Sequence, residues 1–411
     1  MRILWLSHLV PYPPKGGVLQ RAHYMLREVT NYHEVDLLAF NQKYLIAPFF
    51  PSVEAGLEEA KKALDKHCKK IIFVDIPVDK TKYGKHLMAL KSLVSSDPYT
   101  INWLKSREYA QQLKKLLAEN DYDLIHFDTI SLLPYFGAIG NIPAVLDHHN
   151  IESHMLLRRA ENESSLLKKW YYRQEGLRLE VKEKKYCPKF SLNITCSEVD
   201  AVRLRDISPD SNVVEVPNGV DVDYFKSDKT VQQRLSLIFV GTLSWYPNIE
   251  AVNFIAYELW PALKSEMPEV SVDIIGANPP EDLVRLASKD SRFRVHGFVD
   301  DVRPHLDQAS VYICPINDGG GTKLKILDAL SMKKAIVAHP VACEGIAVTE
   351  GKNVLFAESV AQYIVAIKQL LEKDSLRITM GNAARELVEE KYSYSKIGKS
   401  LSELYLSHIK K

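Results

Sequence analysis

The sequence has few cysteines and no long hydrophobic run. Its five cysteines are an odd number and contain no C-x-x-C pair, and they are Cys68, Cys187, Cys196, Cys314 and Cys343. This pattern argues against both a disulfide framework and a zinc site, and it favours a reduced, cytoplasmic setting. No apolar run approaches the roughly 20 residues that a membrane-spanning helix needs, so a soluble or peripheral protein is expected.

The chain also lacks a charge bias and a dinucleotide-binding fingerprint. Its 53 basic residues nearly cancel its 52 acidic residues, which gives no general attraction to nucleic acid, so any basic surface has to be local. The pattern G-x-G-x-x-G is absent, which argues against a nicotinamide oxidoreductase. The opening MRILWLSHLV leads into Pro11, Pro13 and Pro14 without a small-residue cleavage site, so it predicts a buried first strand rather than a signal peptide.

What is present indicates two α/β domains. A chain of 411 residues with 46% hydrophobic residues is long enough for two domains of about 200 residues each. In both halves short buried-strand runs alternate with helical stretches, which predicts mostly parallel, doubly wound sheets. The segment Val216-Pro217-Asn218-Gly219-Val220-Asp221 interrupts this alternation. We therefore predict a first domain at 1–215, a linker at 216–234 and a second domain at 235–392.

A glycine-rich turn in the second half predicts an anion site. A strand over Ser310–Cys314 leads to Gly319, Gly320 and Gly321, and a helix is expected from Thr322 to Lys333. Unpaired backbone N–H groups and the helix dipole converge at such a turn, and Lys323 adds a positive charge. Similar turns follow the first strand of each half, at Gly16-Gly17 and Gly241-Thr242, and a purely structural turn at Gly16-Gly17 stays an alternative.

Two adjacent histidines end a predicted strand of the first half. His148 and His149 follow Asp147 and precede Asn150 and Glu152. Imidazoles at the carboxyl end of a parallel strand suit polar or proton-transfer roles, although a structural role for either remains open. A charged helical stretch is expected from about Ser153 to Tyr186. Its mixed charges favour a solvated, salt-bridged helix over one that rests on lipid headgroups.

Several motifs together carry a family resemblance. They are Gly16-Gly17, His149-Asn150-x-Glu152, the 216–221 segment, Phe239-Val240-Gly241, His296-Gly297-Phe298-Val299-Asp300-Asp301, Gly-Gly-Gly-Thr-Lys at 319–323, and Tyr392-Ser393-Tyr394. In this order the chain resembles the family 4 retaining glycosyltransferases, which have the two-Rossmann-domain GT-B fold. The resemblance implies facing domains with a central cleft, a donor on the second domain, an acceptor on the first, and a C-terminal helix at 393–411 that crosses back to the first.

The resemblance also implies roles for individual residues. Gly320, Gly321, Thr322 and Lys323 would hold the donor diphosphate, with Gly16, Gly17, Gly241 and Thr242 completing the donor site. Asp328 matches the residue that bonds the ribose hydroxyls, with a Lys325–Asp328 pair on a wet helix face as the alternative. Phe298 and Val299 match the base-binding loop. Two departures stand out, because Gly320 replaces a common acidic residue and the segment after Gly241 lacks the usual arginine and lysine.

The expected activity is transfer of a sugar from a UDP- or GDP-linked donor to a saccharide or lipid-linked acceptor, with retention of anomeric configuration. His149 or His148 would line the donor sugar, and neither a metal nor a cofactor is expected. The open alternatives are a sugar-nucleotide epimerase or hydrolase of the same fold and a non-catalytic sugar-nucleotide-binding scaffold. Nucleic acid is not an expected partner, whereas peripheral contact with the inner face of the membrane is.

Overall fold

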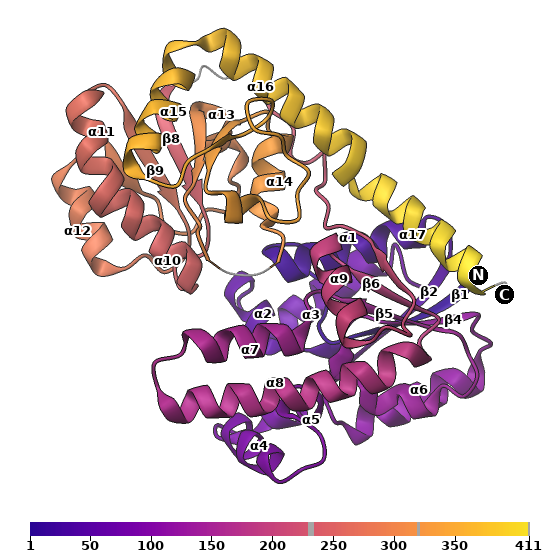
Figure 1. The fold of residues 1–411 in the computed structure, drawn as a ribbon. Helices are drawn as coiled ribbons and strands as arrows, with labels where there is room; N and C mark the ends of the chain where they lie inside the picture. The colour runs from indigo at the N-terminus through magenta and orange to yellow at the C-terminus, as the bar shows by residue number, and fades with distance from the viewer. Residues whose placement is uncertain (229–233, 319–320, 410–411) are drawn as a thin grey trace. The chain divides into compact units, whose positions relative to one another are not determined.

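Two parallel sheets organise the chain. The structure, a computed structural model, describes residues 1–228, 234–318 and 321–409, and its elements are shown in Figure 1. The contacts divide the chain into two units. The first unit comprises Met1–Pro217 and Ser395–Lys411, and the second comprises Asn218–Tyr394.

The sheet of the first unit has seven strands in the order β3-β2-β1-β4-β5-β6-β7, and every pairing is parallel. Most of these strands are short apolar runs that are buried on both faces. This is typical of a parallel sheet that helices cover on both sides. Their bounds are β1 Arg2–Ser7, β2 Glu34–Asn41, β3 Lys70–Asp75, β4 Leu124–Phe127, β5 Ala144–His148, β6 Leu192–Thr195 and β7 Val213–Glu215.

Helices connect these strands, and serine caps fix the start of several of them. The hydroxyls of Ser52, Ser106 and Ser197 accept hydrogen bonds from the backbone of the helices that they precede. The helices are α1 Gly17–Thr30, α2 Lys43–Ile46, α3 Val53–Leu64, α4 Gly84–Leu93, α5 Tyr99–Asn102, α6 Arg107–Glu119, α7 Glu152–Asn162, α8 Leu166–Tyr186, α9 Glu198–Ile207 and α17 Tyr394–Ile409.

The single long helix expected over 153–186 is wrong, because two helices occupy this stretch. Glu163 has an extended backbone after α7, and its carboxylate accepts a hydrogen bond of 3.0 Å from the backbone N–H of Ser165 just before α8. The two helices then lie side by side (Figure 1). Gly176 allows this close approach, since a Cβ at that position would lie 2.9 Å from the Leu157 side chain.

The sheet of the second unit has six strands in the order β10-β9-β8-β11-β12-β13, again all parallel. The strands are β8 Arg234–Val240, β9 Ser271–Ile275, β10 Phe293–Val295, β11 Ala309–Cys314, β12 Ala335–Ala338 and β13 Leu355–Phe356. The helices are α10 Tyr246–Asn253, α11 Trp260–Glu266, α12 Glu281–Lys289, α13 Arg303–Gln308, α14 Leu324–Ser331, α15 Val360–Glu372 and α16 Asp374–Leu387.

Helix α14 is shorter than the expected 322–333. Lys323 has an extended backbone and forms the N-cap, so the helix begins at Leu324. At the other end Lys333 has a positive φ of 55°, which a continuing helix does not allow. The strand that precedes this turn begins at Ala309, one residue before the expected start.

The chain returns to the first unit near its end. Ile397, Leu401 and Tyr405 of α17 are buried, and the Tyr405 hydroxyl lies 2.8 Å from Nδ1 of His126 in β4. Just before the return, the two segments that lead into and out of the second unit pair with each other. The Val220 N–H donates to the Tyr392 carbonyl at 2.8 Å, and the Tyr394 N–H donates to the Val220 carbonyl at 3.3 Å.

Both sheets have the doubly wound order, in which the strand sequence reverses direction once. The reversal lies between β1 and β4 in the first unit and between β8 and β11 in the second. Ligands of open α/β sheets bind at the carboxyl ends of the strands at such switch points. Among the described residues no helix combines the length and the apolar character of a membrane span, and all five cysteines are buried free thiols.

Candidate active site

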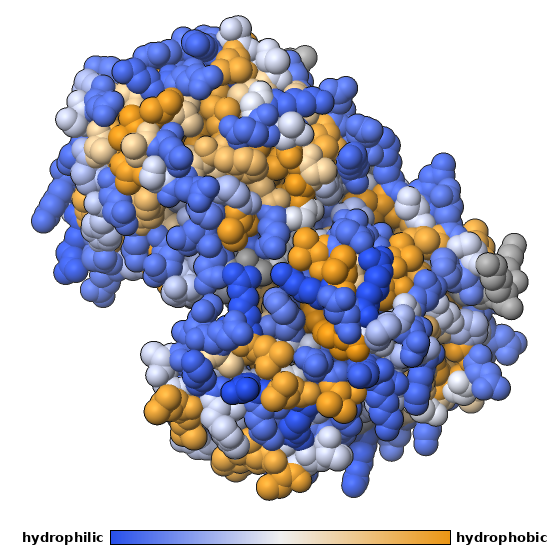
Figure 2. Space-filling model, viewed as in Figure 1, coloured by the Kyte–Doolittle hydropathy of each residue, from blue (hydrophilic) through white to orange (hydrophobic). Residues whose placement is uncertain are grey.

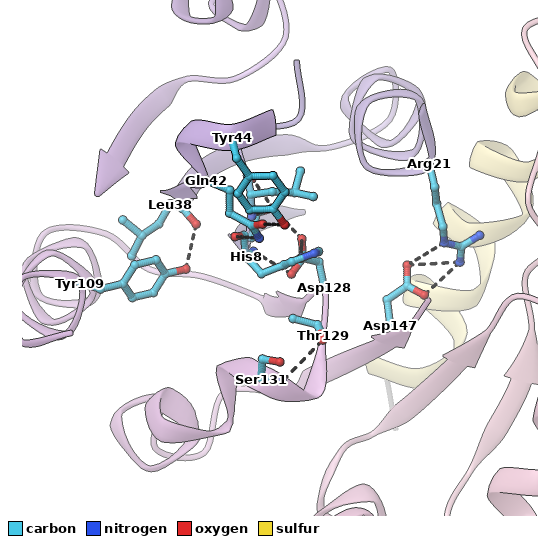
Figure 3. Close-up of polar contacts among 12 residues, drawn as sticks. His8, Arg21, Leu38, Gln42, Tyr44, Tyr109, Asp128, Thr129, Ser131 and Asp147 are labelled. Carbon is cyan, nitrogen blue, oxygen red and sulfur yellow. Dashed lines mark hydrogen bonds and ion pairs between the residues drawn. The ribbon is translucent and has the colours of Figure 1, made fainter. Parts of the chain in front are cut away.

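The switch point of the first unit brings a histidine and an aspartate together. His8 follows β1 and Asp128 follows β4, and because these strands are neighbours the His8 Nδ1 lies 2.9 Å from the Asp128 Oδ2 (Figure 3). The Ser7 hydroxyl donates to Asp128 Oδ2 at 2.5 Å, and the His8 backbone N–H donates to Oδ1 at 2.9 Å. The carboxylate is therefore held from three sides.

The charges of this pair support each other. Burial disfavours the imidazolium of His8, but the Asp128 carboxylate outweighs burial and raises the pKa of His8. Burial likewise favours the neutral acid of Asp128, but His8 outweighs it and lowers the pKa of Asp128. His149, whose ring centroid lies 5.5 Å from that of His8, differs because burial lowers its pKa to about 4 and keeps the imidazole neutral.

A cavity of about 310 Å³ opens at this point. Its polar contacts are ordered, because the Gln42 amide donates to the His8 carbonyl at 2.7 Å and the Tyr44 hydroxyl donates to Gln42 Oε1 at 2.7 Å (Figure 3). The lining combines aromatic rings with neutral hydroxyl and amide groups. It is formed by His8, Leu9, Val18, Gln42, Tyr44, Leu45, Tyr99, Thr100, Trp103, Thr129, Ser131, His149, Asn150 and Glu152.

The two candidate histidines point to different places. His149, together with Asn150 and Glu152, lines the cavity. His148 does not, since its Nε2 lies 3.2 Å from the Asn193 Oδ1 in β6 and its side chain is buried in the sheet. The geometry thus favours His149 for a role in the cavity and gives His148 a structural role.

Gly16 and Gly17 start helix α1 and do not line the cavity, although Val18 does. Gly16 has a φ of 91°, a value that favours glycine. The next turn of the helix carries Arg21, which the sequence analysis did not single out. Its buried guanidinium donates to both Asp147 oxygens, at 2.9 and 3.2 Å (Figure 3). It also donates to the carbonyls of Val216 and Pro217.

The second unit carries the glycine-rich turn, of which Gly319 and Gly320 lie outside the described residues. Gly321 has a φ of 75°, and Lys323 is 4% exposed, with its Nζ donating to the Gly321 carbonyl at 2.9 Å. The Thr322 Oγ1 is buried without a hydrogen-bond partner in the described part of the chain. Lys323 thus helps to hold the loop at the start of α14.

Lys325 was expected from the sequence only as a possible partner of Asp328, not as part of the donor site. Its Nζ donates to Oδ1 of Asn248 in α10, and the Asn248 amide donates to the Thr242 carbonyl at 2.8 Å. Gly241 leaves room for this group, because a Cβ at that position would lie 2.5 Å from the Lys325 ammonium and would displace it. The segment 241–248 after β8 has no basic residue, and the ammonium from α14 occupies the space beside it. Burial lowers the pKa of Lys325 to about 8.

Asp328 lies one turn further along α14. Burial raises the pKa of its carboxyl to about 8, against the attraction of Lys325. The alternative of a simple Lys325–Asp328 pair on a wet helix face is wrong, because both residues are partly buried and the ammonium binds Asn248. A carboxyl group in this state can donate a hydrogen bond as well as accept one.

The loop after β10 presents Phe298 and Val299. Phe298 is 53% exposed, and Val299 packs against the core of the second unit. Gly297 before them has a φ of 67° and turns the chain at the carboxyl end of the sheet. Thr242 follows β8 at the same end, so the second unit gathers an aromatic ring, two ammonium groups and a glycine-rich turn there.

The fold of both units and their switch-point sites define a two-domain, Rossmann-like α/β protein of the GT-B type. Residues 234–373 match the family described as glycosyl transferases group 1, and residues 86–224 match glycosyltransferase family 4. Together these matches span well over half of the chain. The protein therefore belongs to the family 4, group 1 glycosyltransferases, and it is a glycosyltransferase.

Individual relatives and solved structures are similar over different lengths. An uncharacterised 44.6 kDa protein of the cps region of Klebsiella pneumoniae is 21% identical over 97% of this chain and 98% of that protein. A phosphatidyl-myo-inositol mannosyltransferase of Mycobacterium tuberculosis is 26% identical, over 47% of this chain and 54% of its own length.

Among solved structures, the fold is shared with Anabaena HepE in complex with UDP. The identity is 16%, the TM-score is 0.68, and the match covers 99% of this chain and 100% of that one. The sucrose-phosphate synthase of Thermosynechococcus elongatus has a TM-score of 0.70 at 14% identity, with 99% of each chain covered.

Proposed function

We propose that the protein transfers a sugar from a UDP- or GDP-linked donor to a saccharide or lipid-linked acceptor with retention of anomeric configuration. The observation that carries the donor half of this proposal is the cation pair at the start of α14. Lys323 and Lys325 lie at the end of the second sheet where ligands of such folds bind, beside a glycine-rich turn. A diphosphate is the anion that two ammonium groups and a helix N-terminus suit.

We assign the ribose and the nucleobase of the donor to neighbouring groups of the same unit. Asp328 of α14 would bond the ribose hydroxyls, and the exposed Phe298 ring would offer a face to the nucleobase. HepE was solved in complex with UDP, which supports a uridine nucleotide as the first donor to test. Because two cations and the backbone can balance the diphosphate, the proposal needs no metal for the donor.

The chemical step breaks the bond between the anomeric carbon and the phosphate oxygen and forms a bond to the acceptor oxygen on the same face. The acceptor proton passes to the oxygen of the departing diphosphate. Negative charge grows on that oxygen in the transition state, so Lys323 and Lys325 would lower the barrier where the charge develops. His149 serves as a neutral polar group that orients a sugar and does not carry the proton away.

The acceptor half rests on the cavity of the first unit. Aromatic rings beside hydroxyl and amide groups suit a saccharide, because sugars present apolar faces and many hydroxyl groups. The similarity to a cps-region protein and to a mannosyltransferase supports an acceptor from polysaccharide or glycolipid synthesis.

A membrane-bound acceptor would suit a further feature of the first unit. Helices α4 and α8 expose apolar side chains, and Figure 2 shows orange groups among the blue where these helices lie. The Arg178 guanidinium of α8 donates to the Ser92 carbonyl of α4 at 2.8 Å, so the two helices meet. Peripheral contact with the inner membrane face is part of the proposal, and the apolar set is Leu87, Leu90, Val94, Leu166, Leu167 and Trp170.

A thermal-shift panel of nucleoside diphosphates and their sugars tests the donor assignment. The expected result is that one base raises Tm and that its sugar nucleotide raises it further. Donor turnover is then followed by NMR with candidate acceptors, where the coupling constant of the new anomeric proton reports retention. Binding of none of the nucleotides contradicts the proposal, and release of free sugar without an acceptor favours a hydrolase.

A further inference from the structure

Three side chains able to ligate a metal converge in the first unit. The strands β1, β4 and β5 are consecutive neighbours in the sheet. His8, Asp128 and His149 each directly follow the carboxyl end of one of them. One ligand atom from each of the three lies within 4.8 Å of the others, and this is the one such group of His, Cys, Asp and Glu in the part of the chain that the structure describes.

The ligand chemistry suits a first-row divalent ion. Two imidazoles and one carboxylate are typical ligands of Zn²⁺, Co²⁺ and related ions, whereas Mg²⁺ and Ca²⁺ prefer oxygen ligands. His8 Nδ1 and Asp128 Oδ2 are 2.9 Å apart. Two atoms each about 2.0–2.1 Å from one ion can have such a separation. The ion would bind both groups at once.

His149 supplies an independent sign of a missing partner. Its Nε2 is buried and has no hydrogen-bond partner among the described residues. Buried imidazole nitrogens usually bind a partner, and an unsatisfied one calls for an explanation such as an absent ion or water. One nitrogen of this ring lies within 4.8 Å of the ligand atoms of His8 and Asp128, so the three groups can close on one ion.

The surroundings provide both support and access. The Ser7 hydroxyl and the His8 backbone N–H hold Asp128, as outer-shell groups hold the ligands of known metal sites. On the open side both imidazoles line the 310 Å³ cavity, which leaves room for water or a sugar hydroxyl on the ion. Glu152 lines the same cavity and adds a second carboxylate nearby.

We propose that His8, Asp128 and His149 form a binding site for one divalent transition-metal ion, with Zn²⁺ as the preferred occupant. This site belongs to the first unit, whereas the proposed donor residues of α14 belong to the second. If the cavity receives the acceptor, which rests on the proposed function, a bound ion occupies its floor and inhibits transfer reversibly.

The test uses tag-free full-length protein and Co²⁺, whose visible absorption reports coordination by imidazole and carboxylate. We expect one equivalent to bind and Zn²⁺ to displace it. His149→Ala and Asp128→Asn should weaken binding by more than the about 10–100-fold that loss of an outer-shell partner causes. His154→Ala is the matched control, because His154 lies on α7 outside the group, and it should bind like the parent.

Each outcome decides the proposal. Absence of a one-equivalent Co²⁺ or Zn²⁺ complex overturns it, as does a His149→Ala variant that titrates like the parent. Circular dichroism checks folding, and His149→Gln replaces the alanine variant if that protein is unfolded. Metal binding without any donor binding would leave this site standing while refuting the proposed transferase, so the two failures can be told apart.

Discussion

The two switch points treat buried charge in opposite ways. At the switch point of the first unit basic side chains face acids, because His8 pairs with Asp128 and the buried Arg21 pairs with Asp147. In the second unit Lys325 and Asp328 are partly buried, and within the described chain Lys325 has a neutral amide as its hydrogen-bond partner. The first arrangement stabilises the fold by itself, whereas the second would be completed by the anionic donor that we propose.

Breaking the Arg21–Asp147 pair of the first unit should have the largest effect on stability. Arg21→Met leaves Asp147 buried without its cation, which typically costs about 3–5 kcal/mol of unfolding free energy. Urea unfolding measures the loss. Lys62→Met in α3 is the control, since both members of its ion pair with Glu59 are exposed and such a surface pair contributes little to stability. Equal losses in the two variants would refute the contrast.

Replacing Lys325, whose hydrogen-bond partner is the neutral Asn248 amide, should weaken donor binding and leave the fold intact. Lys325→Met is expected to weaken nucleoside diphosphate binding by about 10–100-fold, the value of a charged hydrogen bond of about 1.5–3 kcal/mol. Binding of the matching nucleoside, which has no phosphate, should stay unchanged. Calorimetry with both ligands is the measurement, and parallel weakening of both would indicate a structural role.

Glu183 is a buried acid of the first unit that departs from this pattern, because its neighbours are a serine and two other acids. Glu183 accepts hydrogen bonds from the Ser153 N–H and hydroxyl and faces Glu152 and Glu180. Burial raises its pKa to about 7. The stability that it contributes is therefore fully present below its ordinary pKa and is lost as pH rises through about 7.

Glu183→Gln should remove that loss. The parent is expected to lose up to about 2 kcal/mol of unfolding free energy between roughly pH 5 and 7, and the variant should lose less. Thermal unfolding across this pH range measures the difference. A parent that becomes more stable toward neutral pH while the variant does not would contradict the assignment.

The smallest effect should separate the two adjacent histidines. His149→Ala should lower kcat/KM by about tenfold, because it removes a polar group of the cavity. His148→Ala should leave kcat/KM within about twofold and instead lower stability by about 1–2 kcal/mol, since Asn193 loses its partner. Activity assays and unfolding curves of both variants test this, and an exchange of the two effects would reverse the assignment.

The sequence predicted what depends on local pattern and missed what depends on strand order. Apolar runs such as Arg2–Ser7 form strands, and the family resemblance carried the fold class. His8 was not singled out because a lone histidine after a strand has no local signal. Its meeting with Asp128 follows only from β1 lying beside β4. The burial of Lys325 is likewise tertiary, because Gly241 and Asn248 come from segments about 80 residues earlier.

The break between α7 and α8 was missed for a related reason. The whole stretch has charged residues that favour helix, and only the backbone at Glu163 and the packing of Leu157 on Gly176 reverse the chain. The predicted ends of α14 were wrong by two residues on each side. Lys323 is extended and Lys333 has a positive φ, and a lysine in the sequence does not indicate either conformation.

The pairing of Val220 with Tyr392 and Tyr394 has a consequence for engineering. The two ends of the segment 218–394 lie next to each other. The segment is therefore an insertion into the sequence of the first unit, with both of its connections close together. A module of this kind can be excised, or exchanged for the corresponding segment of a relative, through two cuts a short distance apart. If the second unit binds the donor, as we propose, such an exchange would carry donor choice from one relative to another and leave the first unit unchanged.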